Sequence, residues 1–569
     1  MKKHTKDNQE VSGAEALILS LLDENVSTVF GYPGGAIMPV YDALYDYTGQ
    51  LNHYLVRHEQ GATHAAQGYS RVSGKPGVVF ATSGPGATNL ITGIADAQID
   101  STPIVCITGQ VASHLLGTDA FQETDVVGIS MPVTKWNIQV TKAEDIAPAI
   151  AKAFYIATSG RPGPVLVDIT KDAQFGKTIY NYKKCESIRS YFPSAKVKEG
   201  DIKKAAAIIN AATRPFILCG HGVLLSGAEK ELLAVAEKGK IPVASTLLGL
   251  SAFPPDHFLY AGYLGMHGNY GPNLLTNSCD VLIAIGMRFD DRVTGNLEKY
   301  AKQAKVIHFE IDPSEVNKIV PTDVAIIGDA KESMQAILPL IEHKYHSAWI
   351  EKFKYCDAIE HDKVIKHAIQ PNTKNILMSE VIHKLNKLTE GKAVVVTDVG
   401  QHQMVTSRYY KCKLPNHFVT SGGLGTMGFG LPAAIGAKVA MPTKQVIAVL
   451  GDGGFQMTIQ ELGTIMQSNI AVKILILNNN FLGMVRQWQQ LFFDRRYSFT
   501  EMKNPDFITI AKGYGIQGKK VTERNALQNG LSEMLNSKES FLLEVVVENE
   551  ENVFPMVTTG SSVSEIILE

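Results

Sequence analysis

Short apolar runs alternate with longer amphipathic stretches along most of the chain. Within residues 14–172, five runs have the β-branched composition of buried strands: VSTVFG, HYLVRHE, GVVFATSG, PIVCITG and PVLVDIT. The stretches between them have helical spacing, and strands that alternate with helices are typical of βαβ units and a parallel sheet. We therefore expect the α/β fold class.

The same alternation occurs twice more. Further runs are PFILCG, IPVAST, CDVLIAIG and KVIHFEID, and then AVVVTD, HFVTSG, QVIAVLG, VKILILN and FLLEVVV. Polar segments at 177–199 and 343–373 separate the units and have few strand signals. The pattern predicts three consecutive doubly wound parallel-sheet domains, followed by a tail, at residues 10–180, 190–345, 374–547 and 548–569. Three such units in a row are candidates for structural paralogues, although no sequence repeat is visible.

Composition and charge narrow the class of ligand. The 569 residues carry a formal net charge of -2, which gives no electrostatic reason to bind nucleic acid or an acidic membrane surface. The amino terminus, MKKHTKDNQE, lacks the apolar core of a secretory signal, and no apolar run approaches the length of a membrane span. The six cysteines have no metal-ligand spacing. We expect a cytoplasmic protein whose ligands are small metabolites.

Two strand ends in the third unit carry oxygen ligands. The run at 445–450 ends on Gly451-Asp452-Gly453, and the run at 472–477 ends on Asn478-Asn479. A carboxylate and amide oxygens suit a hard cation that also binds a diphosphate, and glycines let the backbone approach the phosphates. Without a ligand, the same residues would form an ordinary turn between strand and helix.

Glycine-rich loops follow other strands. Residues 423–428 fit GxGxxG, which allows a dinucleotide site, although the acid expected after the next strand would be Asp452, which suits a metal better than a ribose hydroxyl. In the first unit, loops at 31–35 and 83–89 and the lone carboxylate of Glu59 follow strand ends. A single Glu is more often a helix-terminal charge, but three such features on one sheet favour a binding site.

Together these motifs resemble the thiamine-diphosphate-dependent enzymes, and most closely the acetohydroxyacid synthase family. The resemblance covers nearly the whole chain. Its general marks are Glu59 and the segment 451–479. Its narrower marks are the segments 31–35, 120–124, 288–295, 422–432 and 482–488. The three expected domains then correspond to a pyrimidine-binding domain, a central Rossmann-like FAD-binding domain and a diphosphate-binding domain.

The resemblance implies thiamine diphosphate and Mg²⁺ as cofactors. The carboxylic acid that matches Glu59 activates the aminopyrimidine ring, and a bulky apolar side chain that matches Met427 supports the folded shape of the cofactor. The implied metal ligands are Asp452, Asn479 and the backbone carbonyl of Phe481. The other implied contacts of this cofactor are Gly400, Gln401, His402, Gly425, Gly453, Gly454, Gly483 and Met484.

The resemblance also implies a reaction. Pyruvate loses carbon dioxide, and the hydroxyethyl unit is transferred to pyruvate or 2-ketobutyrate, giving 2-acetolactate or 2-aceto-2-hydroxybutyrate for valine, leucine and isoleucine. The matching catalytic residues are Glu59, Gln122, Lys171 and Gly35, and the matching substrate contacts are Phe121, Arg292, Trp488 and Val485. An arginine fork suits a carboxylate. Without the resemblance, Trp488 would be read as a packing residue.

FAD is a third implied cofactor. Its matching contacts are Arg161, Gly220, Gly222, Thr246, Leu247, Met266, His267, Arg288, Glu310, Ile311 and Asp329. Glu310 ends a predicted strand, where a carboxylate suits a ribose hydroxyl. His221 departs from the family pattern, which has a small residue between the two glycines.

The resemblance implies a homodimer or homotetramer, because the Glu59 domain of one subunit meets the metal-binding domain of another. It also implies a small regulatory subunit. The alternatives are a flavin-independent catabolic acetolactate synthase, a pyruvate oxidase, or a non-catalytic paralogue that binds nucleotides.

Overall fold

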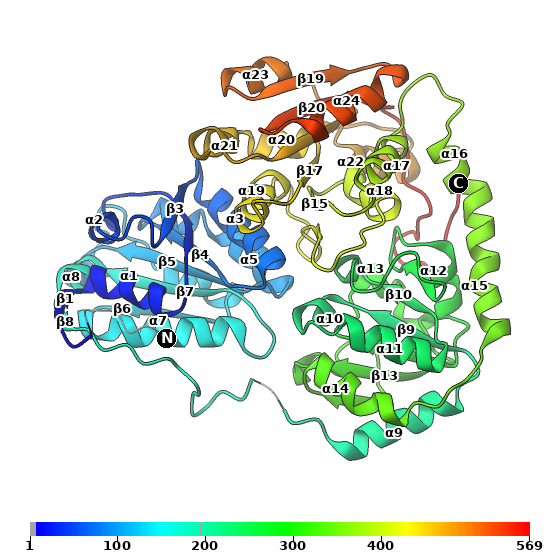
Figure 1. Ribbon diagram of the computed structural model, residues 1–569, viewed down its shortest axis with the longest axis horizontal. Helices are drawn as coiled ribbons and strands as arrows, with labels where there is room; N and C mark the ends of the chain where they lie inside the picture. Colours follow the sequence, from blue (N-terminus) through cyan, green and yellow to red (C-terminus); the bar gives the residue numbers. More distant parts are fainter. Residues whose placement is uncertain (1–6, 194) are drawn as a thin grey trace.

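Three six-stranded parallel sheets form the body of the molecule in the computed structural model, which describes residues 7–193 and 195–569. The three units lie side by side in Figure 1, with the first in blue and cyan, the central one in green, and the third in yellow to red. A short antiparallel pair, β1 with β8, is added to the first unit. The arrangement confirms the expected α/β class of three consecutive sheet units.

The elements of each unit follow one another in sequence. The first unit contains β1 Glu10–Ser12, α1 Gly13–Asp23, β2 Thr28–Gly31, α2 Met38–Tyr45, β3 Asn52–Leu55, α3 Glu59–Ser73, β4 Gly77–Ala81, α4 Pro85–Thr88, α5 Ile91–Ile99, β5 Ile104–Gln110, α6 Val126–Ser130, β6 Trp136–Val140, α7 Ile146–Thr158, β7 Val165–Thr170, α8 Lys171–Phe175 and β8 Lys177–Ile179. The central unit contains α9 Glu199–Ala211, β9 Pro215–Cys219, α10 His221–Leu225, α11 Glu229–Gly239, β10 Val243–Ser245, β11 Tyr260–Tyr263, α12 Tyr270–Thr276, β12 Val281–Ile285, α13 Asp291–Thr294, β13 Lys305–Glu310, β14 Val324–Ile327 and α14 Ala330–Ile337. After α15 Ser347–Glu360 and α16 Lys366–Ile369, the third unit contains α17 Met378–Thr389, β15 Val394–Thr397, α18 Gln401–Tyr409, β16 Phe418–Val419, α19 Gly430–Ala440, β17 Val446–Gly451, α20 Asp452–Met457, α21 Leu462–Ser468, β18 Lys473–Asn478, α22 Gly483–Phe492, α23 Phe507–Gly513, β19 Gln517–Val521, α24 Arg524–Asn536 and β20 Phe541–Val546.

The strand orders show which units are alike. The first sheet has the order β3-β2-β4-β5-β7-β6 and the third has β16-β15-β17-β18-β20-β19, so the two orders match position for position. The central sheet has the order β11-β10-β9-β12-β13-β14, which is the order of a Rossmann fold. The candidate paralogy of all three units is therefore wrong for the central one.

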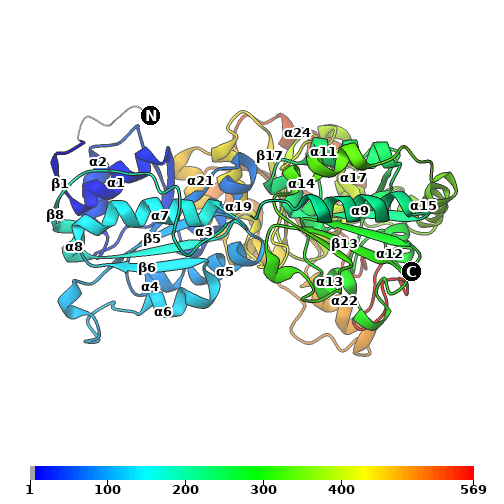
Figure 2. The same cartoon turned by 90° about the horizontal axis from the view of Figure 1, so that it is seen from below.

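Each sheet has a hydrophobic core on both faces, because successive residues of a strand point to opposite sides. In β5, Val105 and Ile107 belong to one core, and Ile104 and Cys106 belong to the other. Figure 2 shows α1 and α7 on one side of the first sheet and α4 to α6 on the other. Continuous apolar runs such as this one are why these strands are recognisable in the sequence.

Several boundaries differ from the prediction. The run HYLVRHE forms a strand only at Asn52–Leu55, and Glu59 is already the first residue of α3. Residues 343–373 are mostly helical, and α15 runs along the outer side of the central and third units (Figure 1). In the part of the chain that the structure describes, no helix is long and apolar enough to cross a membrane.

Candidate functional site

The point where strand order reverses marks the ligand edge of each sheet. In the central sheet this point lies between β9 and β12, and in the third sheet it lies between β15 and β17. Two cavities open at these two edges, and they share the wall formed by Val399, Gly400, Met427, Met484 and Val485. The predicted cofactor residues of the central and third units are therefore brought together.

The smaller cavity, of about 50 Å³, lies at the edge of the third sheet. Its lining includes the predicted residues Gly400, Gln401, His402, Met427, Asp452, Gly453, Gly454, Asn479, Phe481, Gly483 and Met484. His402 is buried, and its Nε2 has no hydrogen-bond partner. Burial lowers the pKa of His402 to about 3, so the ring is neutral. A water molecule bound to a diphosphate would satisfy this nitrogen, which fits the expected cofactor.

Asp452 has the environment of a hard-cation ligand. Its carboxyl is buried, and this burial raises its pKa to about 6. The side chain of Asn504 donates 2.6 Å to Asp452 Oδ2 and orients it. Asn479 lines the same cavity, and its Oδ1 accepts the Phe481 N–H at 3.2 Å. Carboxylate, amide and backbone oxygens are the ligands that Mg²⁺ takes together with phosphate, so this donor set fits the expected metal.

The two asparagines after β18 have different positions. Asn478 does not line the small cavity: its Nδ2 donates 2.7 Å to Glu544, and its Oδ1 accepts from Asn504 at 3.0 Å. The prediction that both asparagines present oxygen ligands at this strand end is therefore wrong for Asn478. Successive residues at a strand end point in opposite directions, so only Asn479 lines the cavity.

The larger cavity, of about 1060 Å³, lies between the central unit, the third unit and α5 of the first. Its lining includes Arg161, Gly222, Thr246, Leu247, Met266, His267, Arg288, Glu310, Ile311 and Asp329, which are the predicted FAD contacts except Gly220. This volume is large enough for a dinucleotide. His267 is buried with Nδ1 unpartnered, which leaves a polar atom for a ligand to satisfy.

The polar groups at the central edge already have partners. Glu310 Oε1 accepts the N–H groups of Ile311 and Asp312, and burial raises the pKa of Glu310 to about 7. Asp329 caps α14 by accepting from Lys331 and Glu332. Arg161, a predicted FAD contact, has other partners in this structure: its guanidinium donates hydrogen bonds to Ser101, Asp312 and Glu315. Acceptors from the first and central units thus hold this arginine.

Gly220 and Gly222 are required by packing as well as by any ligand. A Cβ at Gly220 would lie 2.4 Å from the Gly286 oxygen, and one at Gly222 would lie 2.6 Å from the Gly286 Cα. The turn after β9 therefore packs directly on the turn after β12. Between the two glycines, the Nδ1 of His221 lies 2.9 Å from the carbonyl oxygen of Asp100. His221 thus joins two units.

Predicted substrate contacts lie on both sides of the large cavity. Arg292 is largely exposed, lines the cavity, and has its Nη1 3.7 Å from the sulfur of Met266. Val485 and Trp488 line the other side, from α22, and Trp488 packs against Phe492 with ring centroids 4.9 Å apart. A carboxylate bound by Arg292 would therefore share the cavity with Trp488.

The remaining predicted residues are gathered on the first sheet. Glu59 is buried, and its Oε2 accepts from Asn89 at 3.0 Å. A Cβ at Gly84 would lie 2.8 Å from the Gln122 oxygen, so the loop that carries Gln122 covers the turn after β4. The other residues of this edge are Gly35, Phe121 and Lys171. None of these predicted first-sheet residues lines either described cavity.

Some supporting residues carry no sequence signal of their own. Asn504 comes from an irregular segment before α23, and Asp398 accepts the N–H groups of Gly428 and Gly430 near Met427. Arg408 is buried, bonds to Glu360, and donates to the carbonyl oxygens of His267 and Gly268. Among these residues, only Asp398 could be identified from the sequence, because it lies at the end of a predicted parallel strand, where ligands bind in such sheets.

Known families match all three units. The models for the N-terminal TPP binding domain, the central domain and the C-terminal TPP binding domain of thiamine pyrophosphate enzymes match residues 11–129, 202–337 and 398–545. The chain is 46% identical to the acetolactate synthase large subunit of Buchnera aphidicola subsp. Schizaphis graminum, over 98% of each chain. It is 46% identical to the probable acetolactate synthase large subunit of Methanocaldococcus jannaschii, over 98% of this chain and 95% of that one. It is 44% identical to the isozyme 3 large subunit of Escherichia coli K12, over 98% of each.

Proposed function

This chain belongs to the acetolactate synthase large-subunit family of thiamine pyrophosphate enzymes, and we propose that it is a biosynthetic acetohydroxyacid synthase. It decarboxylates pyruvate and transfers the hydroxyethyl unit to pyruvate or 2-ketobutyrate, for valine, leucine and isoleucine biosynthesis. The observation that supports this function best is the joining of Arg292, Met427 and Trp488 in one cavity that continues into the Asp452 site. The domain boundaries at 10–180, 190–345 and 374–547, and a cytoplasmic location, belong to the same proposal.

The third unit holds thiamine diphosphate and Mg²⁺ in this proposal. Asp452, Asn479 and the Phe481 carbonyl bind the metal, and Gln401 and His402 receive the diphosphate. When bound, the cofactor supplies the carbon nucleophile and the electron sink that decarboxylation needs. Met427 borders both cavities and supports the cofactor between them.

The first unit supplies the proton chemistry. Glu59 exchanges a proton with the pyrimidine ring, and Asn89 orients the carboxyl by its bond to Oε2. In the complete site, Gly35, Gln122 and Lys171 would act on the reacting groups, and Phe121 would contact the substrate. Arg292 binds the carboxylate of the second 2-keto acid, and Val485 and Trp488 sort acceptors by size.

FAD binds in the larger cavity, against the central sheet. The support is the Rossmann strand order, the size of the cavity and the lining that includes Glu310, Ile311 and Asp329. Purified protein is therefore expected to be yellow. We expect activity with added thiamine diphosphate and Mg²⁺, and both products when pyruvate and 2-ketobutyrate are supplied together. Colourless, active protein that makes only acetolactate would instead favour the flavin-independent catabolic enzyme.

Partners are part of the proposal. The relatives are named large subunits, which implies a small partner, and we propose a regulatory subunit here. We also propose a homodimer or homotetramer, because the Glu59 edge lines neither cavity of its own chain. The chain in this view offers two half-sites that are completed by another copy.

A further inference from the structure

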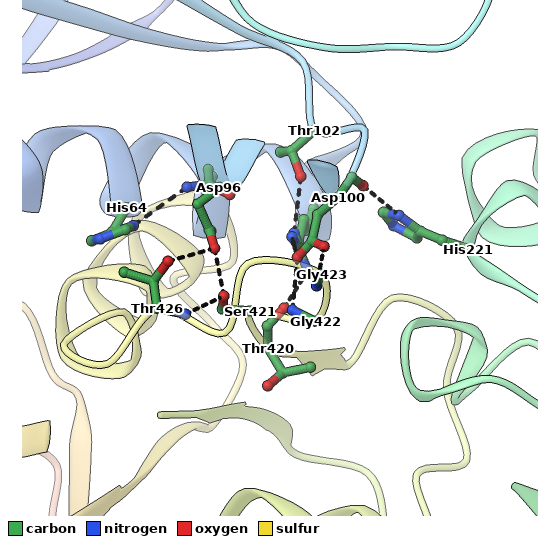
Figure 3. Close-up of polar contacts among 12 residues, drawn as sticks. His64, Asp96, Asp100, Thr102, His221, Thr420, Ser421, Gly422, Gly423 and Thr426 are labelled. Carbon is green, nitrogen blue, oxygen red and sulfur yellow. Dashed lines mark hydrogen bonds and ion pairs between the residues drawn. The ribbon is translucent and has the colours of Figure 1, made fainter. Parts of the chain in front are cut away.

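Helix α5 of the first unit ends at a junction where all three units meet. The 420–427 loop of the third unit, which carries Gly425 and Met427, contacts both the end of this helix and the central unit, and Figure 3 shows it beside Asp96 and Asp100. A Cβ at Gly423 would lie 2.8 Å from the Ile99 side chain, and a Cβ at Gly422 would lie 2.6 Å from the Leu248 side chain. On this side the loop is therefore in close contact with both neighbouring units.

Asp100 binds the backbone of this loop. Its carboxylate accepts the N–H groups of Gly422 at 2.8 Å and Gly423 at 2.7 Å. Arg71 of α3 donates 2.7 Å to the same carboxylate and 2.5 Å to the Thr420 carbonyl oxygen. The carboxylate side chain of Asp100 is fully buried, so these charge-assisted bonds are not exposed to solvent.

Asp96, one turn earlier on α5, binds two side chains of the same loop. Its Oδ1 accepts from the hydroxyls of Ser421 and Thr426, the latter at 2.9 Å (Figure 3). Ser421 in turn accepts the Thr426 N–H at 2.8 Å. The two carboxylates therefore define the path of the loop up to the residue before Met427.

The backbone of Asp100 faces the central unit. Its carbonyl oxygen only accepts hydrogen bonds, so the His221 Nδ1 at 2.9 Å must carry the proton. Burial, followed by the charge of Arg71, lowers the pKa of His221 to about 4, so the neutral ring is the form that makes this bond. His221 adjoins Gly222 in the wall of the large cavity. Asp100 thus contacts the wall of the large cavity through its carbonyl oxygen, and the 420–427 loop through its carboxylate.

We propose that Asp100 is a positioning residue that couples the two cofactor sites, so that a flavin nucleotide bound beside His221 strengthens the binding of thiamine diphosphate against Gly425 and Met427. The inference rests on the proposed function, because it assumes that both cofactors bind. A ligand against Gly222 orders the turn that carries His221, and this order reaches the loop through the bond to Asp100. Thermodynamic linkage requires that thiamine diphosphate strengthen flavin binding by the same factor.

The test measures the dissociation constant of thiamine diphosphate with Mg²⁺, with and without saturating FAD, on the full chain freed of cofactors. Trp488 lines the cavity, so tryptophan fluorescence reports binding, and FAD binding is followed separately by its absorbance. In the native protein, FAD should lower the dissociation constant by about fivefold or more. In His221→Ala, the two constants should agree within about twofold.

Asp280→Asn is the matched control. Its carboxylate also accepts two backbone N–H groups, from Thr213 at 2.8 Å and Arg214 at 2.9 Å, but it does not line the cavity. This variant should keep the flavin effect. Asp100→Asn should lose it, and should also increase hydrogen exchange of the 420–427 loop more than that of the rest of the chain, which separates a local effect from a general loss of stability.

The outcomes separate the inference from the proposed function. If the native chain binds FAD and thiamine diphosphate without mutual effect, or if His221→Ala keeps the effect, the coupling is refuted and the function stands. If the native chain binds no FAD, the flavin part of the proposed function fails, and the coupling fails with it.

Discussion

The first and third sheets have the same strand order, but their ligand edges have different surroundings. The edge of the third sheet is enclosed: Asp452 is 1% exposed, and the central unit continues its cavity. The edge of the first sheet is open: Phe121 is 88% exposed, and a Cβ at Gly35 would meet no atom within 4 Å. A shared topology therefore places loops at the same point of two sheets, while the neighbouring unit decides which edge becomes a cavity.

The chemistry of the two edges is complementary. The third edge carries the proposed metal and diphosphate ligands, and the first carries the proposed acid, Glu59. Since Glu59 lines neither cavity of its own chain, one chain holds two halves that do not meet. In a site shared by two copies, the second copy would cover the exposed residues of this open edge and complete the site around the buried acid.

Replacing the acid should give the largest effect. We expect Glu59→Gln to lower turnover by about a hundred-fold or more, because the amide cannot share a proton with the pyrimidine ring. Thiamine diphosphate binding should change little, since Asp452 and Asn479 are intact. Steady-state kinetics and cofactor titration measure both quantities. Glu144→Gln, an exposed glutamate of the same unit, is the control, and equal turnover in the two variants would refute the role of Glu59.

Mixing two inactive chains tests whether the halves come from different copies. Glu59→Gln and Asp452→Ala chains, produced together, should recover about a quarter of native activity, because half of a random mixture of dimers is mixed and each mixed dimer has one intact site. Either chain alone should be nearly inactive. If no activity returns although mixed dimers are present, the two edges of a single chain must act together, and the site would not be shared between copies.

A smaller change in the enclosed half should alter selectivity rather than rate. Trp488→Leu is expected to reduce the preference for 2-ketobutyrate over pyruvate by about tenfold, because a large apolar wall of the acceptor pocket is lost. Acetolactate formation should largely remain. The measurement is the product ratio in a competition assay. Phe492→Leu removes the ring that packs on Trp488 but does not line the cavity, so it should keep most of the preference.

How much of this could be predicted from the sequence depends on the kind of contact. Buried central strands such as β17 and β18 are continuous apolar runs and can be recognised in the sequence. Because ligands bind at the carboxyl ends of parallel strands, the ends of these two runs then locate Asp452 and Asn479 at one edge of the sheet. The prediction does not include the edge strands β6 and β19, because all but the last residue of each are half-buried or exposed and several are polar. Their sequence resembles that of the loops.

Contacts between units could not be predicted. The bonds from Gly422 and Gly423 to Asp100 join residues more than 300 positions apart, and neither periodicity nor spacing marks such a pair. Asn504 orients Asp452 from a segment without regular structure. The sequence thus predicts which strand ends carry chemistry, while the supporting residues depend on how the units pack.

The first and third units also contact each other within one chain, away from the two cavities, and Glu461 at this contact provides the smallest test. It is fully buried in the third unit, and its carboxyl accepts the Arg57 N–H, two residues before Glu59, at 3.1 Å. Burial raises the pKa of Glu461 from 4.5 to about 7. The folded state therefore keeps a proton that the unfolded state releases between pH 4.5 and 7, so the stabilising contribution is complete below this window and is lost as pH rises through it.

Glu461→Gln removes this titration while it keeps an oxygen for Arg57. One pKa unit corresponds to about 1.4 kcal/mol, so the free energy of unfolding of the variant should gain at most about 3 kcal/mol on the native protein between pH 5 and 8. We expect the difference between their thermal midpoints to change by about 3 °C over this range. Scanning calorimetry at several pH values measures it, with Glu533→Gln, on the exposed side of α24, as control. A difference that does not vary with pH would mean that Glu461 is charged in the folded state, and that a charged rather than a neutral carboxyl joins the first unit to the third.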